Sequence, residues 1–171
     1  MPAADTSISE GNNVQIRRMR DGEADAVAEV WHRSGQAAYP FIETWCSFSL
    51  EQARGAFRNG IAARCAVWVA EIAGEVVGFL ALNGSYLDRL YVGPDHQGQG
   101  AGTGLLKKAM ALSPDGLELH THQKNTRACA FYEKNGFVPV KYGVSPPPES
   151  EPDVEFHWRP ANNASRNARP S

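Results

Sequence analysis

The pattern of hydrophobic and polar positions divides the chain into alternating predicted strands and helices. Apolar positions at helical spacing predict helices, and short alternating runs between turn residues predict strands. Strands are predicted over residues 14–19, 65–72, 75–82, 86–92, 117–121, 137–142 and 154–158, and helices over residues 21–34, 50–58, 100–112 and 125–135. We expect Asp21 to cap the first helix and Gly35 to end it. Residues 37–48, which are rich in aromatic side chains, are expected to be irregular.

The order of these elements indicates one domain that mixes strands and helices, an α/β (α+β) fold. A chain of 171 residues is typical of a single domain. We expect this domain to span residues 14–159. The polar segment 1–13 and the tail 160–171, in which alanine is the only apolar side chain beside proline, are expected to be disordered.

A glycine-rich turn follows the fourth predicted strand and leads into a helix. It contains Gly98, Gly100, Gly102 and Gly104. Backbone N–H groups at a helix N-terminus are unpaired and partly positive, so a turn without side chains at that point suits a phosphate group. The spacing fits neither the dinucleotide fingerprint nor the P-loop, but it contains the pattern Gln97-x-x-Gly100-x-Gly102. A turn that only joins a strand to a helix is the alternative interpretation.

A second pattern lies in the helix predicted over residues 125–135. Asn125, Ala128 and Tyr132 are spaced i, i+3, i+7 and therefore share one helix face. Asn125 can cap this helix, and Gly136 can end it. The two patterns in this order are far more specific than either one alone.

Together, the two motifs resemble the acetyl-CoA-binding motifs of the GCN5-related N-acetyltransferase family, and the resemblance extends over residues 14–159. It implies a mixed, mostly antiparallel sheet flanked by helices on both faces. In that fold the central strands separate, and acetyl-CoA lies in the resulting cleft. The resemblance therefore implies an acetyl-CoA-dependent N-acetyltransferase that moves the acetyl group directly to a primary amine of a small molecule or peptide.

The resemblance also implies which residues bind the cofactor, from the pantetheine arm at the end of the fourth strand to the pyrophosphate at the glycine-rich loop. In chain order they are Leu90, Tyr91, Val92, Gln97, Gly98, Gln99, Gly100, Ala101, Gly102, Thr103, Gly104, Asn125, Arg127 and Tyr132. Tyr132 aligns with the general acid of the family, because a phenol is protonated at neutral pH and can donate to the departing thiolate. Core packing is the alternative for Leu90, Val92 and Tyr132, and a solvated side chain is the alternative for Arg127.

The base that takes a proton from the amine is less well defined by the sequence. Asp88 is favoured, because strand alternation places it on the same face as Leu90 and Val92, next to the cofactor loop. The other candidates lie on neighbouring strands and are, in order of preference, Glu71 and then the face that carries Glu118, His120 and His122. An ordinary surface charge is the alternative for each of them.

Composition argues against several other classes of protein and site. A net charge of −2 gives no sign of nucleic-acid binding, and no apolar run approaches the ~20 residues of a membrane span. Segment 1–13 lacks the charged-then-apolar order of a secretory signal. The three scattered cysteines, Cys46, Cys65 and Cys129, indicate reduced thiols and hence the cytoplasm. His120 and His122 lack a third ligand at a suitable spacing, so no metal is expected.

The sequence leaves the acceptor and some of the chemistry open. The aromatic segment 31–48 is expected to form a wall of the acceptor site, but nothing in the sequence names the amine. The alternatives are a CoA-binding regulatory module without turnover, an acyltransferase with another acyl group, and transfer to an oxygen acceptor. A homodimer also stays open.

Overall fold

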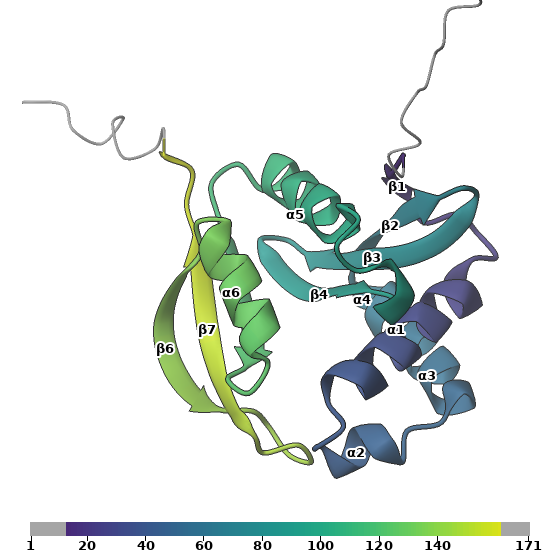
Figure 1. The fold of residues 1–171 in the computed structure, drawn as a ribbon, viewed down its shortest axis with the longest axis horizontal. Helices are drawn as coiled ribbons and strands as arrows, with labels where there is room; N and C mark the ends of the chain where they lie inside the picture. Colours follow the sequence, from purple (N-terminus) through teal and green to yellow (C-terminus); the bar gives the residue numbers. More distant parts are fainter. Residues whose placement is uncertain (1–12, 162–171) are drawn as a thin grey trace, which may run out of the picture.

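The structure, a computed structural model, describes residues 13–161 (Figure 1). Within these residues seven strands form one sheet in the order β1-β2-β3-β4-β5-β7-β6. The strands are β1 (Gln15–Arg18), β2 (Ala66–Ile72), β3 (Glu75–Asn83), β4 (Tyr86–Val92), β5 (Leu117–His122), β6 (Val138–Val144) and β7 (Pro152–Trp158). All neighbours are antiparallel except β4 and β5, which are parallel. The segments expected to be disordered lie outside the described residues, apart from their inner ends, and stay predictions.

Helices cover both faces of this sheet. They are α1 (Ala24–Ala38), α2 (Glu43–Cys46), α3 (Leu50–Ala56), the π-helical turn η1 (Phe57–Ile61), α4 (Ala62–Arg64), the 3-10 turn η2 (Pro94–His96), α5 (Ala101–Leu112) and α6 (Thr126–Lys134). Helices α1 and α3 pack on one face, and α5 and α6 pack on the other (Figure 1). The predicted fold, a mostly antiparallel sheet with helices on both faces, is therefore confirmed.

Strand β3 lies between two hydrophobic cores. Leu80 and Leu82 face the core under α5 and α6, whereas Phe79 and Ala81 face the core under α1 and α3. Side chains alternate across a strand, so a strand that is covered on both sides must be apolar at consecutive positions. This requirement explains the buried run from residue 77 to residue 82. The two cores fix β3, and β3 in turn holds β4 in register at the edge of the site.

The helices differ from the prediction mainly around Gly35, which does not end α1. The helix starts after Glu23 rather than after Asp21, and it continues through Gly35 to Ala38. Gly35 is buried inside the helix because the ring of Trp45 packs directly against its Cα, where a side chain would overlap it. The glycine therefore supplies space for a tertiary contact, which helix-ending rules do not consider. In addition, α2 lies inside the segment expected to be irregular, and helical structure after Leu50 extends to Arg64.

None of the helices within residues 13–161 has both the length and the apolar stretch needed to cross a membrane.

We expect Gly35→Ala to destabilise the protein by about 1–3 kcal/mol, because its new Cβ would overlap the Trp45 ring. The matched control is Gly55→Ala in α3, where an added Cβ meets nothing within 4 Å. That change should stabilise the protein by roughly 0.5 kcal/mol through the restricted unfolded chain. Urea unfolding of both variants measures the two effects. A Gly35→Ala variant as stable as Gly55→Ala would show that the Trp45 contact is not tight.

Candidate active site

The sheet opens between β4 and β5. One residue pair, Tyr86 with Glu118, is in register between them, and the Glu118 N–H donates to the Ser85 carbonyl at 3.0 Å. Beyond this pair the strands are no longer hydrogen-bonded to each other, and residues of both strands line a cavity of about 1540 Å³. Because the strands are parallel, their C-terminal ends meet at this opening.

The loop after β4 presents unpaired backbone N–H groups at the opening. Gly98 and Gly100 have φ angles of 79° and 90°, a conformation that favours glycine. Gly100 is the N-cap of α5, and the first hydrogen bond of this helix runs from the Gly104 N–H to the Gly100 carbonyl at 3.0 Å. The N–H groups of residues 101–103 therefore have no partner within the helix. Such a helix start attracts an anion.

Most of the residues predicted to hold the cofactor line this cavity. They are Leu90, Tyr91, Val92, Gln97, Gly98, Gly100, Gly102, Thr103, Asn125, Arg127 and Tyr132. Gln99, Ala101 and Gly104 are not part of the lining. Ala101 is buried in the core, and a Cβ on Gly104 would lie 3.2 Å from Ile16 of β1. The structure thus corrects the prediction for Gly104, whose N–H is already paired and whose Cα packs against β1.

The end of β4 is held by side chains from two directions. The Gly93 N–H donates to β3 at 2.8 Å, and backbone groups alternate along a strand, so the N–H and carbonyl groups of Leu90 and Val92 face away from β3. The Val92 carbonyl accepts from Ser34 Oγ of α1 and from Gln97 Nε2 of the loop, both at 3.2 Å. Remaining backbone groups on this edge are open to an extended ligand arm in the cavity.

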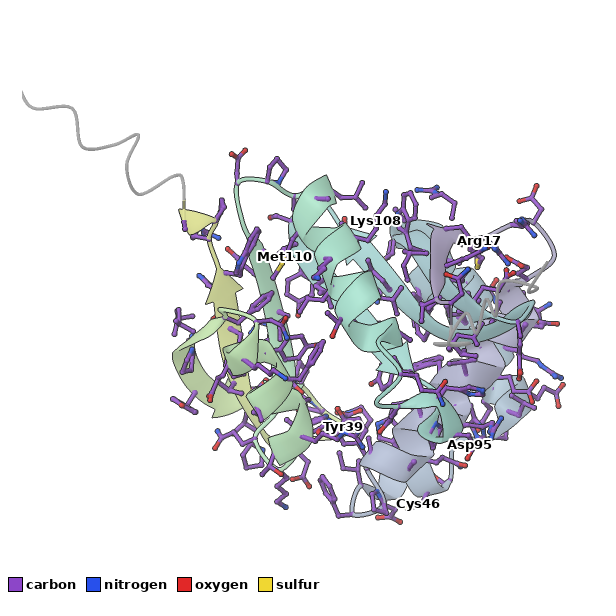
Figure 2. All side chains as sticks on the ribbon, turned by 45° about the horizontal axis from the view of Figure 1, so that its top comes forward. Arg17, Tyr39, Cys46, Asp95, Lys108 and Met110 are labelled. Carbon is purple, nitrogen blue, oxygen red and sulfur yellow. The ribbon has the colours of Figure 1, made fainter. Side chains whose placement is uncertain are left out.

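Asn125 connects α6 to the C-terminal end of α1. Its side-chain oxygen accepts from the Ala128 N–H at 3.1 Å, which confirms the predicted cap. Its Nδ2 donates to the hydroxyl of Tyr39, the residue that ends α1, at 3.1 Å. Figure 2 shows Tyr39 at the lower end of α6, on the side of α1. Arg127, the second residue of α6, is exposed and forms no ion pair with a carboxylate of the described chain, so its charge is free for a ligand.

Tyr132 is both a core residue and part of the cavity wall. Its ring is 6% exposed and packs against Phe137 and Phe156 at centroid distances of 5.4 and 6.0 Å. Burial raises the pKa of Tyr132, with smaller contributions from the neighbouring Tyr39 and Cys129. The hydroxyl is therefore fully protonated at neutral pH and can act as a proton donor.

The expected alternation in β4 is broken by a bulge, and this changes the position of Asp88. The register with β3 shifts between Ala81 and Leu82, which leaves Asp88 as an extra residue in β4. Leu87, which is buried with Leu82, takes the core face that alternation had assigned to Asp88. The prediction that Asp88 shares the face of Leu90 and Val92 is therefore wrong.

Asp88 still lines the cavity, but two arginines hold its carboxylate. Its side chain is 12% exposed, and the carboxylate lies 3.2 Å from Arg64 Nη2 and 3.4 Å from Arg89 Nη1. Accepting a proton would weaken both ion pairs. Asp88 therefore fits an electrostatic anchor better than a base.

Glu71 lies outside the cavity lining, in an ion network at the other end of the sheet. Arg17 Nε donates to Glu71 at 2.8 Å, and Arg17 Nη2 contacts Glu23 at 2.6 Å. The Arg17 guanidinium lowers the pKa of Glu23 to about 2. This network ties β1 to β2 and to the start of α1, which is a structural role.

The face of β5 carries two histidines that line the cavity, and they have different partners. His120 Nδ1 lies 2.9 Å from the hydroxyl of Tyr86, and His120 Nε2 lies 3.9 Å from Glu155. His122, the last residue of β5, places Nε2 at 2.9 Å from the carboxylate of Glu149. Glu149 was not predicted, because it comes from the connection between β6 and β7. Its only signal in the sequence is the run of prolines just before it, which indicates a stiff loop.

One group of ligand-type side chains within residues 13–161 could hold a metal ion. Atoms of Glu118, Glu155 and His157 lie within 4.8 Å of one another. His157 is bonded to Glu155 at 2.9 Å, and this bond lowers the pKa of Glu155. Glu118 and His157 are outside the cavity lining, so an ion at this position would stand beside the site rather than in it.

Aromatic side chains of α1 and the following segment form another wall of the cavity. Trp31, Trp45 and Phe48 line it and contact one another edge to face at centroid distances of 5.4–5.7 Å. The sequence predicted an aromatic wall here, and the same rings also form part of the core under α1. An apolar stem of an acceptor would fit against this surface.

Comparisons with known proteins agree with the geometry. Residues 63–139 match the family model described as the acetyltransferase (GNAT) domain. The peptidyl-lysine N-acetyltransferase YjaB of Salmonella typhimurium is 35% identical over 125 residues, which cover 72% of this chain and 83% of that protein.

Solved structures show the same fold. The solution structure of apo YjaB from Escherichia coli has a TM-score of 0.68 at 27% identity, covering 85% of this chain and 97% of that one. The structure of yncA from Salmonella typhimurium with its cofactor acetyl-CoA has a TM-score of 0.66 at 16% identity, covering 86% and 94%. An identity of 35% over most of both proteins, joined to this shared fold, means that the chain belongs to the GCN5-related N-acetyltransferase family and is an acetyl-CoA-dependent N-acetyltransferase.

Proposed function

We propose that the protein transfers the acetyl group of acetyl-CoA directly to the ε-amine of a lysine in a peptide or protein. The observation that carries this proposal is the arrangement of the cavity, in which unpaired N–H groups of the loop after β4 and the protonated Tyr132 of α6 border the same space. The N–H groups hold an anionic cofactor, and Tyr132 donates a proton to the thiolate of that cofactor. The relative named as a peptidyl-lysine N-acetyltransferase supports the choice of acceptor.

The cofactor is proposed to lie across the opening between the strands. Its pyrophosphate accepts from the N–H groups of residues 98–103, where the positive end of α5 adds to the attraction. Arg127 faces a phosphate, Asn125 stabilises the turn that leads into α6, and the pantetheine arm lies beside the backbone of Leu90 and Val92. This arrangement places the thioester between the C-terminal end of β4 and Tyr132.

The acceptor is proposed to enter from the side of the aromatic wall. A lysine stem packs well on aromatic surfaces, and its charged end is attracted by carboxylates. Glu149, Asp153 and Glu155 line the cavity on the side of β7. We place the activity in the cytoplasm, because all three cysteines are free thiols, one of them exposed, which suits a reducing compartment.

The chemistry needs a proton for the leaving group. The amine nitrogen bonds to the thioester carbon, the C–S bond breaks, and Tyr132 gives its proton to the thiolate. Burial keeps this phenol protonated until the thiolate forms.

The test of function offers the protein acetyl-CoA with three acceptors: an N-terminally blocked peptide with one lysine, a lysine-free peptide with a free N-terminus, and a small alkylamine. Free CoA release and peptide mass report transfer. We expect the lysine peptide to have the highest kcat/KM. Tyr132→Phe should lower kcat by about 10²-fold, because it removes one hydroxyl and keeps the packed ring.

Several results would contradict this proposal. Preferred transfer to the free N-terminus or to the alkylamine would exclude lysine as the main acceptor. CoA binding without turnover on any acceptor would favour a regulatory module. A kcat of Tyr132→Phe equal to that of the wild type would leave Tyr132 with its packing role alone.

The cofactor loop is tested by thermal unfolding with and without CoA. At a hundredfold excess over Kd, CoA should stabilise the wild type by ~2.7 kcal/mol, which is a Tm increase of roughly 5–10 °C. Gly100→Val should abolish this increase, because a side chain there would project into the space in front of the loop and is strained at a φ of 90°. Gly102→Ala is the control, since its Cβ would meet only ordinary contacts at 3.7 Å.

The Tm without ligand separates loss of binding from loss of fold. A Gly100→Val variant that keeps the full CoA-dependent increase would overturn the assignment of the pyrophosphate to this loop. A larger increase with NAD or ATP than with CoA would contradict the choice of cofactor.

A further inference from the structure

The proposed transfer leaves one role unassigned, because the lysine must lose a proton before it can attack the thioester. We propose that His122 is the base that takes this proton and that Glu149 is its positioning residue. This inference rests on the proposed function and concerns the same cavity. It replaces Asp88, which the sequence favoured.

The contact with Glu149 decides which nitrogen of His122 is free. The carboxylate of Glu149 forms an ion-pair contact with Nε2 at 2.9 Å. Its negative charge favours the neutral tautomer with the hydrogen on Nε2, which leaves the lone pair on Nδ1. A carboxylate that fixes the tautomer in this way prepares the opposite nitrogen to accept a proton.

That opposite nitrogen has no partner. His122 Nδ1 is buried and forms no hydrogen bond within residues 13–161, although the side chain as a whole is 12% exposed and lines the cavity. Buried polar atoms in proteins are normally paired, and an unpaired one indicates a missing ligand or a functional role. A rotation of the imidazole that turns Nδ1 towards the cavity would let a substrate ammonium, or a water between the two, supply the hydrogen that this lone pair lacks.

The position of His122 also brings it close to the proposed acid. The ring of Tyr39 contacts the ring of His122 edge to face at a centroid distance of 4.8 Å. The hydroxyl of Tyr39 is bonded to Asn125 on α6, and Tyr39 is the first neighbour that adds to the raised pKa of Tyr132. His122 and Tyr132 therefore line the same cavity and share Tyr39 as a neighbour.

Two rival bases that line the cavity already have partners. Asp88 is bonded to two arginines, and His120 is bonded to Tyr86. Four titratable groups face His122 from the elements packed on it. Glu149 comes from the β6–β7 connection, and Asp153 on β7 is the cross-strand partner of His122. Tyr39 lies at the end of α1, and the thiol of Cys129 on α6 contacts the His122 carbonyl at 3.8 Å. Among these, His122 is the group with an unpaired ring nitrogen.

Each proton that moves in this mechanism has a donor and an acceptor. His122 Nδ1 takes one proton from the lysine ammonium, and the neutral amine bonds to the thioester carbon. When the C–S bond breaks, the sulfur takes the proton of Tyr132, and the phenolate recovers a proton from the attached nitrogen. His122 then releases its proton to solvent, which leaves an amide, free CoA thiol and one proton in solution.

The experiment measures kcat/KM for the lysine peptide from pH 6 to pH 10 in the wild type and in single variants. The wild-type value should rise with pH, because His122 must be neutral to act. His122→Gln, which keeps a similar size and polarity without the basicity, should lower kcat by about 10²–10⁴-fold and lose the limb of the profile that belongs to the imidazole. Glu149→Gln should keep that limb with a smaller loss of kcat, as expected for a positioning residue.

Asp88→Asn and His120→Gln compare the rival bases, and the CoA-dependent Tm increase checks that each variant still folds and binds cofactor. Added imidazole should restore part of the activity of His122→Ala, a result that a structural role would not give. The inference would be overturned if kcat/KM of His122→Gln rose with pH as it does in the wild type. It would also be overturned if Asp88→Asn or His120→Gln lost this rise instead. If the wild type itself acetylates no amine, the proposed function fails, whereas an active wild type with an unaffected His122→Gln defeats only the choice of base.

Discussion

The rest of the site depends on one feature of the sheet, the parallel pairing of β4 and β5 through a single registered residue pair. Parallel neighbours need a crossover connection, and here α5 provides it. The chain must therefore turn from the C-terminal end of β4 directly into a helix N-terminus. The same pairing brings the C-terminal end of β5, with His122, to the edge where this turn lies. One topological constraint thus places the anion-binding loop and the proposed base at the same opening.

An opening in a sheet leaves backbone groups and apolar surfaces uncovered, so the two sides must be held by other contacts. Ser34 and Gln97 both donate to the Val92 carbonyl, which fixes the end of β4. On the other side, Tyr39 joins α1 to α6 through Asn125 and packs against His122. The residues that close the opening therefore also line the cavity in which we propose that the reaction takes place.

Local patterns in the sequence, together with the family resemblance, were sufficient to predict the fold and most of the residues that line the cavity on the side of the loop after β4. These patterns are short-range signals: the glycines of the loop, the cap at Asn125 and the spacing from Asn125 to Tyr132. Gly98 and Gly100 have positive φ angles, Asn125 caps α6, and Tyr132 lines the cavity. Gly104 is an exception, because its role depends on Ile16 of β1, which is far away in the sequence.

The predictions that failed depend on contacts between distant segments. Gly35 stays inside a helix because Trp45 packs on it, and Asp88 leaves its expected face because the register with β3 shifts at Ala81. Glu149 reaches His122 from a loop 27 residues later in the chain, and no periodicity could have signalled that contact. The proposed base depends on contacts from three separate elements, which explains why the sequence left it open.

In the mechanism that we propose, one cavity holds the cofactor, the acid and the base around the opening between β4 and β5. A crystal structure with a bisubstrate ligand, in which CoA is joined to a lysine peptide, would locate all three. We expect the pyrophosphate on the N–H groups of residues 98–103, the sulfur within hydrogen-bonding distance of the Tyr132 hydroxyl, and the lysine nitrogen near His122. A ligand whose sulfur lies away from Tyr132, or whose lysine lies on the far side of the sheet from His122, would contradict this mechanism.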